Sequence, residues 1–583
     1  MKIQKHYKEE GSIMKRLMLI FTLFFVLLGF VACKSSTNSG DSFISSIEVK
    51  GSTSEVVIVE DTINSSFTIV DEEGVNITSE NNVFVITTGG TFTASGKLEE
   101  GQIYVNASGE TIEIVLEGVS LSNSSKSPIF VNDCETLEIK AKKGSTNYIY
   151  DNRCTDYSDS SDETVGTAAI YAKNGDLKFT GKGTLSIVSN YNSGIHGKDN
   201  VKIKNLTLLI KAMNNGIKGN DKVTIEENPT IGIVCGNNGI VTSNSDKGSS
   251  SQHGYIYING GTITINSYGD GIDAAYAVEI GTGNDDEGNT YTPVIDIYTN
   301  IYSSYSSTTS LKTSSDTSVI SKLSLSSESI FSNARGGGFN GGGFSGGKSA
   351  EKSDSSAKAI KAVEAINISN GTIFTYTYDD GLHTNNDTLE TGVKGSASIN
   401  ISGGTIKIKA SDDGIHADGE LKISEGEVYI AESHEGLEGN IINITGGTIT
   451  IFADDDGVNA SSQINISGGR LDVSVSPNGD TDGIDSNGTI TISGGVTIAR
   501  GPNSEMAAPI DADGTIKATG GTLIIIGYAK NISGNSLTKS TSTNGLTSGS
   551  HIVTIGSQTI TYENNTSYSG KVTIYASSSA TIK

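Results

Sequence analysis

The chain has 583 residues, of which 71 are Gly and only 6 are Pro, and its formal net charge is −25. Collagen needs periodic Gly with abundant Pro, and a coiled coil needs far more than 18% charged residues, so both classes are excluded. Because phosphate recognition depends on Lys and Arg, the acidic balance argues against nucleic acid as a partner. The high Gly and low Pro content predicts many short strands joined by tight turns.

The N-terminus carries an export signal. Lys15 and Arg16 precede an apolar run at residues 17–31, and the polar segment after Cys33 is rich in Ser and Asn. The run is short for a transmembrane helix and typical of a signal-peptide core. Small residues before Cys33 resemble a bacterial lipobox, so residues 1–33 are predicted to be a signal peptide and Cys33 the lipidated mature N-terminus. An ordinary cleaved secretion signal is the alternative. We therefore expect an exported protein, lipid-anchored to the bacterial cell envelope.

Residues 34–85 are predicted to form a linker and a strand-rich N-terminal cap, and a repeated turn follows them. An acidic residue or Asn, a Gly, an aliphatic residue, any residue and a small residue recur, as in Asp-Gly-Ile-His-Ala at residues 413–417. The turn glycines are Gly194, Gly216, Gly239, Gly271, Gly381, Gly414, Gly436, Gly457 and Gly483. Where they are closest, one copy follows another after about 22 residues, which is typical of a solenoid.

A second signature, Gly-Gly-x-Ile-x-Ile, lies between the turns. In the copy that begins at Gly403, Ile406 and Ile408 alternate with polar residues, which predicts a strand with one buried face. Short strands in a repeat of about 22 residues predict an all-β fold, a single-stranded right-handed parallel β-helix over residues 86–530. A row of antiparallel sandwiches is the alternative, but it would not show a constant repeat.

Other segments depart from the repeat. Residues 300–358 are Ser-rich and then Gly-rich and are predicted to be a flexible insertion, residues 143–166 a second, Asp-rich insertion, and residues 531–583 C-terminal coils or a cap. Residues 342–349 match a P-loop pattern, but they lie in low-complexity sequence rather than between a strand and a helix, so we expect no nucleotide binding.

Three cysteines follow Cys33. Cys134 and Cys154 are close enough in sequence for a disulfide across a loop, and Cys235 is expected to be a free buried thiol. The disulfide state stays open at this point.

Several segments together resemble a known family. Residues 90–96, 190–195, 356–362, 412–419 and 435–439 resemble the bacterial carbohydrate-binding parallel β-helix domain family, which includes a cellulosome-associated protein that binds plant cell-wall polysaccharide. The resemblance covers roughly residues 85–530. It implies a fold similar to that of polysaccharide lyases, polysaccharide binding and bound calcium.

Carboxylates gather at the turns, and equivalent positions on neighbouring coils lie about 4.8 Å apart. Carboxylates at that distance repel one another unless a hard cation such as Ca²⁺ binds between them. The candidate ligands are Asp379, Asp380, Asp412, Asp413, Asp455, Asp456, Asp480 and Asp482. No EF-hand is expected, because Thr489 stands where its last Glu ligand would be. The alternative is that these are solvated turn residues.

A row of aromatic and basic residues is the candidate sugar-binding surface. If Ile406 and Ile408 point inward, Lys407 and Lys409 point outward, and aligning the coils on the turn Gly places several aromatic residues beside them. The predicted carbohydrate-binding residues are Phe374, Tyr376, Tyr378, Tyr429, Phe452, Lys407 and Lys409. An exposed apolar stripe is typical of a binding surface. The alternative is that residues 300–358 fold over this face.

Catalysis is the competing interpretation. The candidate bases are Lys361, Lys394, Lys409 and Arg500, none of them in a recognisable motif, and the recurring His196, His383 and His416 are expected in a solvent-facing position of the turn. We therefore predict a monomeric cell-envelope lipoprotein that binds polysaccharide non-catalytically with the help of calcium. A calcium-dependent lyase or a hydrolase is one alternative, and a structural adhesin is another.

Overall fold

The computed structural model describes residues 63–153, 165–244, 246, 248–299, 356–386, 396–533 and 536–583. Within these ranges the secondary structure is almost entirely β-strand, and no helix occurs that is long and apolar enough to cross a membrane. The predicted all-β class is confirmed. The signal peptide, Cys33, Cys154, Lys394 and nearly all of the predicted insertion at 300–358 lie outside the described residues.

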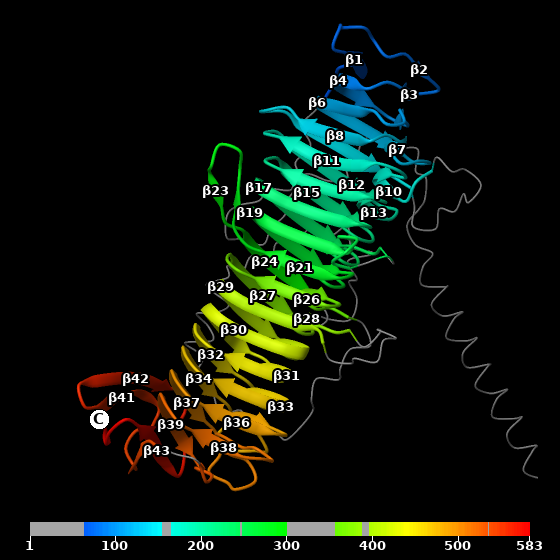
Figure 1. The fold of residues 1–583 in the computed structure, drawn as a ribbon. Helices are drawn as coiled ribbons and strands as arrows, with labels where there is room; N and C mark the ends of the chain where they lie inside the picture. Colours follow the sequence, from blue (N-terminus) through cyan, green and yellow to red (C-terminus); the bar gives the residue numbers. More distant parts are fainter. Residues whose placement is uncertain are drawn as a thin grey trace, which may run out of the picture. The chain divides into compact units, whose positions relative to one another are not determined.

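Most strands fall into three columns, in which each strand pairs in parallel with its counterpart one coil before and one coil after (Figure 1). Column A contains β3 (Val83–Ile86), β5 (Gln102–Asn106), β7 (Ile129–Asp133), β10 (Ala168–Ala172), β13 (Ser193–Gly197), β16 (Ile217–Gly219), β18 (Ile240–Val241), β20 (Ile272–Ala274), β25 (Ile360–Ala362), β28 (Leu382–Thr384) and β35 (Ile484–Ser486). Column B contains β8 (Thr136–Ala141), β11 (Asp176–Gly181), β14 (Asn200–Lys204), β21 (Ala277–Ile280), β26 (Ala365–Ile368), β36 (Thr489–Ile492) and β38 (Ile516–Ala518).

Column C contains β9 (Thr146–Asp151), β12 (Thr184–Ser189), β15 (Thr207–Ala212), β24 (Val294–Thr299), β27 (Thr372–Thr377), β32 (Thr448–Phe452), β34 (Arg470–Ser474), β37 (Val496–Arg500) and β39 (Thr522–Gly527). Longer strands bend from one column into the next: β4 (Gly90–Leu98), β6 (Thr111–Asn123), β17 (Lys222–Cys235), β19 (Tyr255–Ser267), β29 (Ser398–Ala410), β30 (Ile415–Glu432), β31 (Leu437–Ile444) and β33 (Val458–Ile466).

Aliphatic ladders fill the space between the columns. Ile210, Ile233, Ile265 and Ile297 are register partners on four successive strands of column C, and each is fully buried or nearly so. Alternation along each strand sends every second side chain inward, and parallel pairing in register places like residues over one another. The Ile-rich pattern of the sequence thereby becomes a continuous core.

The turn glycines allow the coils to approach closely. The N–H of Gly414 donates to the carbonyl of Glu435, and the N–H of Ile415 donates to that of Gly436 (2.9 and 3.0 Å). A Cβ atom at Gly414 would lie 2.6 Å from the Gly436 carbonyl oxygen and 2.7 Å from Ile430. A larger residue at this position would therefore separate neighbouring coils.

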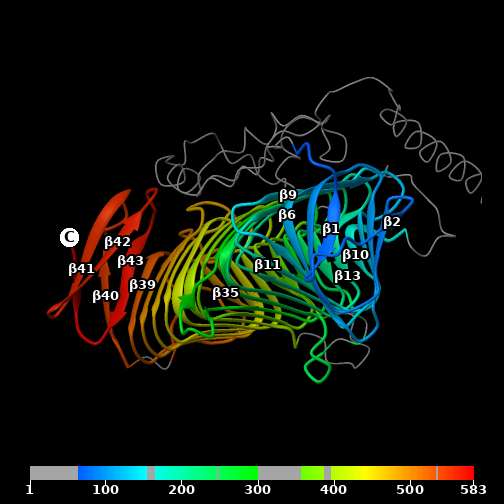
Figure 2. The ribbon, with the colours of Figure 1, turned by 90° about the horizontal axis from the view of Figure 1, so that it is seen from above.

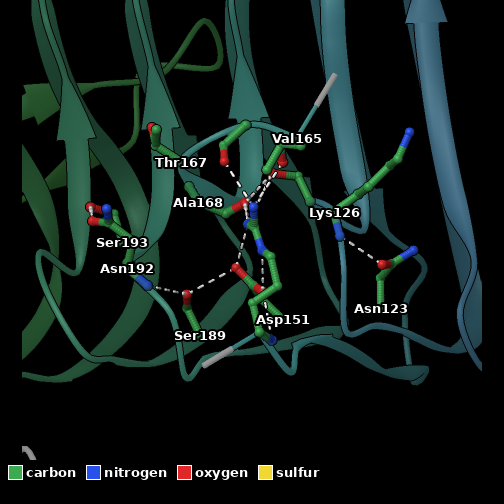
Figure 3. Close-up of polar contacts among 12 residues, drawn as sticks. Asn123, Lys126, Asp151, Val165, Thr167, Ala168, Ser189, Asn192 and Ser193 are labelled. Atoms are coloured by element: carbon green, nitrogen blue, oxygen red, sulfur yellow. Dashed lines mark hydrogen bonds and ion pairs between the residues drawn. The ribbon is translucent and has the colours of Figure 1, made fainter. Parts of the chain in front are cut away.

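A buried ion pair lies close to the point where the described chain stops at residue 153 and resumes at residue 165. The guanidinium of Arg153 donates to both carboxylate oxygens of Asp151 (2.8 and 2.6 Å) and to the carbonyls of Val165 and Ala168 (Figure 3). Both side chains are fully buried. Because buried charges need partners on all sides, this network holds Asp151 and Arg153 against Val165 and Ala168.

The two ends of the described body differ from its centre. β1 (Thr68–Asp71) pairs antiparallel with β4, and β2 (Ser79–Glu80) forms a hairpin with β3, so the described part of the predicted N-terminal cap does contain strands. A small hairpin, β22 (Gly283–Asn284) and β23 (Thr290–Tyr291), projects from the body, as the green loop labelled β23 in Figure 1 shows. Figure 2 shows β1 and β2 toward one end of the body and the C-terminal strands at the other.

At the C-terminal end, β43 (Lys571–Ala576) pairs antiparallel with β39 and β40 (Thr538–Ser542). β41 (Gly549–Ile555), β42 (Gln558–Asn564) and β44 (Ala580–Ile582) form a separate antiparallel sheet. The described part of residues 531–583 thus adds antiparallel strands rather than further parallel coils. Cys134 and Cys235 are buried free thiols in the described chain, and the candidate partner Cys154 lies outside it.

Candidate functional site

The residues before the turn glycines, together with Lys358 before Ala359, lie in one line along the coils, which we call the turn column: Ser193, Asn215, Asn238, Asp270, Lys358, Asp380, Asp413, Glu435, Asp456 and Asp482. Its acidic side chains have a structural role. The N–H of Asp413 donates to Asp380 Oδ1 (3.0 Å), and the N–H of Asp482 donates to Asp456 Oδ1 (2.7 Å). Part of the turn acidity is therefore explained by bonds between neighbouring coils, independently of any metal.

The first predicted calcium cluster has a cation of its own. Ligand atoms of Asp379, Asp380 and Asp412 lie within 4.8 Å of one another. The ammonium of Lys358, which occupies the turn column one coil earlier, lies 2.7 Å from Asp379 Oδ2 and 3.0 Å from Asp380 Oδ2. Burial disfavours the charged form of Asp380, yet His383 and Lys358 lower its pKa well below the usual range. Lys358 therefore supplies charge that a calcium ion would otherwise supply.

The histidines of the turn do not face solvent, which corrects the prediction made for them. His383 and His196 are 7% and 9% exposed, and the rings of His383 and His416 lie 4.7 Å apart. His383 is held by a carboxylate, because its Nδ1 lies 2.6 Å from Asp380 Oδ2. The ring of His196 instead contacts Thr167 and Asn220 (2.9 and 3.2 Å). The sequence alone did not predict this burial, because the residue type that follows Gly-Ile or Gly-Leu differs in nearly every coil.

His416 stands between two acids. Its Nδ1 lies 3.1 Å from Asp413 Oδ2 and 2.8 Å from Glu438 Oε2. Burial disfavours the imidazolium, but the carboxylates of Asp413, Asp418 and Glu438 raise the pKa of His416 to about 12. Burial likewise opposes the charge on Glu438, but His416 lowers its pKa to about 2. Asp413, a predicted calcium ligand, therefore has a protonated imidazole as its partner.

In the coils that follow Glu438, fewer positively charged side chains lie close to the carboxylates. Burial and neighbouring acids raise the pKa of Asp456 to about 7 and that of Asp482 to about 6. Asp455 lies 3.6 Å from His434, and Asp480 is exposed at the tip of its turn. Of these four predicted ligands, only Asp482 belongs to a close acidic cluster in the described chain.

That cluster consists of Asp482, Asp485 and Asp511, with ligand atoms within 4.8 Å of one another. Three carboxylates form the all-oxygen donor set that Ca²⁺ prefers, and burial and the charge of Asp511 raise the pKa of Asp485. Lys530 pairs with Asp511 and is the cation found there. Asp511 was not predicted as a ligand, because Pro509 occupies the position in its coil that the turn Gly occupies in other coils.

The register of the predicted sugar-binding row agrees with the sequence alignment of the coils. Phe374 of β27 is the partner of Lys407 of β29, and Lys407 is the partner of Tyr429 of β30. Tyr376 is likewise the partner of Lys409. Aromatic and basic side chains therefore alternate across successive coils of column C.

The prediction that Phe374 is exposed is wrong. Only 3% of its surface is accessible, because it packs against Tyr298 of β24 with the ring centroids 5.5 Å apart, and Tyr376 and Tyr429 border the pair. Outward orientation on a strand does not guarantee exposure when bulky side chains on neighbouring coils meet over it. Phe374 supports the surface and does not present a face to solvent.

The other members of the row are half-buried: Tyr376, Tyr378, Tyr429, Phe452, Lys407 and Lys409. The ammonium of Lys409 lies 5.4 Å from the centre of the Tyr376 ring and 2.6 Å from Glu432 Oε2. Tyr429 and Phe452 meet edge to face with centroids 6.0 Å apart. These contacts fix the orientation of the rings before any ligand arrives.

The candidate catalytic bases that the structure describes are Lys361, Lys409 and Arg500, and each of them already contacts an acid. Arg500 is 1% exposed, and its guanidinium donates to Asp472 and Asn564 (2.5 and 2.9 Å). Lys361 lies 3.6 Å from Asp270. The sequence analysis included Arg500 among the possible catalytic bases. Its burial under the C-terminal strands makes that prediction wrong.

Comparison with known proteins adds a family. A family model described as carbohydrate-binding domain-containing protein matches residues 79–392, 385–436 and 437–582. A carbohydrate-binding domain-containing protein of Acetivibrio thermocellus is 32% identical over 129 residues, which make up 22% of this chain and 44% of the relative. The chain therefore aligns with less than half of that relative's length.

A solved structure described as the polysaccharide lyase-like protein from C. thermocellum, in a gadolinium derivative, is 30% identical. The match covers 38% of this chain and 84% of that one, with a TM-score of 0.34. The family model, by contrast, spans the strands from β2 to β44. The chain belongs to the family of carbohydrate-binding domain-containing proteins.

Proposed function

We propose that the protein binds a polysaccharide without cleaving it, along the row formed by Tyr376, Lys409, Tyr429 and Phe452 on β27, β29, β30 and β32. The observation that carries the proposal is this row of partly exposed rings on successive coils, within a chain of a carbohydrate-binding family. Neighbouring strands are about 4.8 Å apart, so the row provides a periodic surface across the coils. A linear glycan laid across them would contact one side chain after another.

The chemistry of the row suits a sugar. An aromatic ring gives an apolar face for the C–H groups of a pyranose, and Lys and Tyr provide polar atoms for its hydroxyls. The contact of Lys409 with Tyr376 and Glu432 holds the first ring in place. Rings that are already oriented lose little side-chain entropy on binding, which favours affinity. A non-catalytic role is supported by the pairing of Lys361, Lys409 and Arg500 with acids.

The surroundings of the row complete the proposal. The parallel columns A, B and C are proposed to be the faces of a right-handed parallel β-helix of the cellulosome-associated type. The mature protein is proposed to be an exported monomer that Cys33 anchors to the bacterial envelope through its lipid. The row of Tyr376, Lys409, Tyr429 and Phe452 would then be accessible to glycans outside the cell.

Calcium is proposed to bind at Asp482, Asp485 and Asp511. The raised pKa values of Asp482 and Asp485 reflect carboxylates that the protein's own cations only partly neutralise. A hard divalent cation with oxygen ligands would relieve that repulsion. The same argument gives little support to calcium at Asp379 and Asp380, where Lys358 lies between the acids.

Retention of the mature protein on cellulose, polygalacturonate and host glycans tests the proposal. The double variant Tyr376→Ala/Tyr429→Ala should be retained at least tenfold more weakly than the wild type, because two ring faces are lost. Tyr528→Ala, which removes a half-buried ring beyond β39, should bind as the wild type does. No new reducing or unsaturated ends should appear in any sample.

The same assay separates the alternatives. Released product would contradict non-catalytic binding and favour a lyase or a hydrolase. Absence of retention on every glycan would favour an adhesin. Retention that a chelator leaves unchanged would remove calcium from the proposal while leaving the aromatic row in place.

A further inference from the structure

A basic depression lies at the corner between columns B and C, several coils before the aromatic row. Its volume is about 460 Å³, and it is lined by Lys140, Lys142, Lys143, Lys178, Lys182 and Lys204. Glu227 is the acidic residue among the lining side chains. Such a concentration of lysines is unexpected in a chain with a net charge of −25.

The lysines come from consecutive coils. Val115 of β6 is the partner of Lys140 of β8, and Lys140 is the partner of Thr180 of β11. Lys178 of β11 is in turn the partner of Lys202 of β14, a strand that ends at Lys204. The positive charges therefore recur along the stacking direction rather than around a single point.

Four of the lysines are charged and held in place. The distances from their Nζ atoms to carboxylate oxygens are 2.8 Å for Lys140 and Glu113, 2.6 Å for Lys142 and Glu117, 2.6 Å for Lys178 and Glu138, and 2.6 Å for Lys204 and Glu227. These four side chains remain 25% to 51% exposed. Lys204 also lies 3.0 Å from Glu226 Oε1. An ammonium group has three donors, so one or two carboxylates leave at least one donor available to a ligand.

Lys143 and Lys182 carry the uncompensated charge. Both side chains are exposed, and neither makes an ion pair or a hydrogen bond with the part of the chain that the structure describes. The lining also includes the apolar Val115 and Ala141 with Gly181, and Thr180 and Asn205 add polar atoms. A lining that combines apolar side chains with ammonium groups is suited to a ligand that has C–H surface as well as negative charge.

We propose that this depression is a second binding subsite, which holds an acidic glycan through its carboxylate or sulfate groups. The proposal rests on the polysaccharide binding proposed above but concerns different residues. Lysines on consecutive coils match charges that recur along a linear polyanion better than a single small anion. At physiological salt the repulsion from the rest of the protein is screened beyond about 8 Å, so the local lysines determine the contact.

Charge reversal tests the subsite. In Lys143→Glu/Lys182→Glu the two unpaired ammonium groups become carboxylates, and the ion pairs of the other four lysines are untouched. Binding of polygalacturonate and of sulfated dextran should weaken at least tenfold, with a shallower dependence on salt, because fewer counterions are released. Retention on neutral cellulose should not change. Lys422→Glu/Lys571→Glu, which reverses two exposed lysines elsewhere, has the same net charge and serves as the control.

The outcomes are distinct. Equal weakening in the control pair would mean that net charge alone acts, and unchanged polyanion binding in the Lys143/Lys182 pair would mean that the depression is not used. Either result overturns the subsite while leaving the aromatic row intact. If the pair loses binding to anionic lipid vesicles but keeps polygalacturonate, the depression serves a membrane surface and the proposal is wrong. If the wild type retains no glycan, the proposed function itself fails.

Discussion

At the scale of single residues, the turn column shows how one position can serve several purposes. Asp380 and Asp456 both accept a backbone N–H from the next coil. Lys358 and His383 also neutralise Asp380, whereas burial and the neighbouring acids raise the pKa of Asp456. Equivalent carboxylates in one column thus differ in charge because their neighbours on adjacent coils differ.

Asp456 should make the stability of the fold depend on pH. Its pKa rises from an ordinary value near 4 to about 7 in the folded chain, so the folded state binds a proton that the unfolded state has lost. This contribution is present at low pH and disappears as the pH rises from about 4 to 7. Asp456→Asn, which still accepts the Asp482 N–H, should reduce the loss of stability between pH 5 and 8 by about 1–2 kcal/mol.

Denaturant midpoints at pH 5 and pH 8, measured with chelator present, check this prediction. The difference between wild type and variant cancels the titration of groups in distant coils. Identical pH dependence in wild type and Asp456→Asn would contradict the interpretation.

At the scale of elements, the spacing between coils decides which residues each turn accepts. Gly414 has backbone atoms of the next coil where a Cβ would lie, whereas a Cβ at Gly439 would have its nearest neighbour 3.3 Å away. Gly439 also has Ala417 and Ala460 as register partners on either side. The first glycine is required by packing, and the second stands where alanine already occurs.

Two alanine substitutions test this difference. Gly414→Ala should destabilise the protein by about 1–3 kcal/mol, because the added methyl overpacks the contact with Gly436 and Ile430. Gly439→Ala should change stability by no more than about 0.5 kcal/mol. Thermal denaturation followed by circular dichroism measures both. Equal melting temperatures for the two variants would refute the packing argument.

At the scale of the whole molecule, the C-terminal strands close a sheet that would otherwise be open. β39 is the last parallel strand of column C, and β43 pairs with it in the antiparallel direction. Ile524 and Ile526 of β39 lie in one buried cluster with Val572 and Ile574. Arg500 strengthens the junction by donating to Asn564 and to the Glu563 carbonyl.

Removal of this cap should cause association. A mature chain that ends at residue 530 would expose the backbone edge of β39 together with Ile524 and Ile526, which is a template for edge-to-edge pairing. Size-exclusion chromatography with light scattering should detect oligomers or aggregates. The same truncation with Ile524→Lys and Ile526→Lys should remain dispersed, because charge on an edge strand opposes pairing. A monomeric truncated chain without the lysines would show that the cap does not protect the edge.

Local periodicity was sufficient for the broad features of this protein. Turn glycines and alternating isoleucines predict stacked strands, because side chains alternate along a strand and parallel pairing in register repeats them from coil to coil. The same periodicity predicts that Phe374, Lys407 and Tyr429 lie in one line, and the strand register confirms it.

Contacts between residues one or more coils apart decided the rest. Tyr298 buries Phe374 across a gap of more than 70 positions, Lys358 enters a column of acids, and Asp511 joins Asp482 and Asp485 from a coil without the turn Gly. The basic depression is likewise lined by residues from several coils. Such contacts depend on the size and charge of each neighbour, which no period records, so the sequence indicates the columns while the tertiary structure determines which side chains remain accessible and charged.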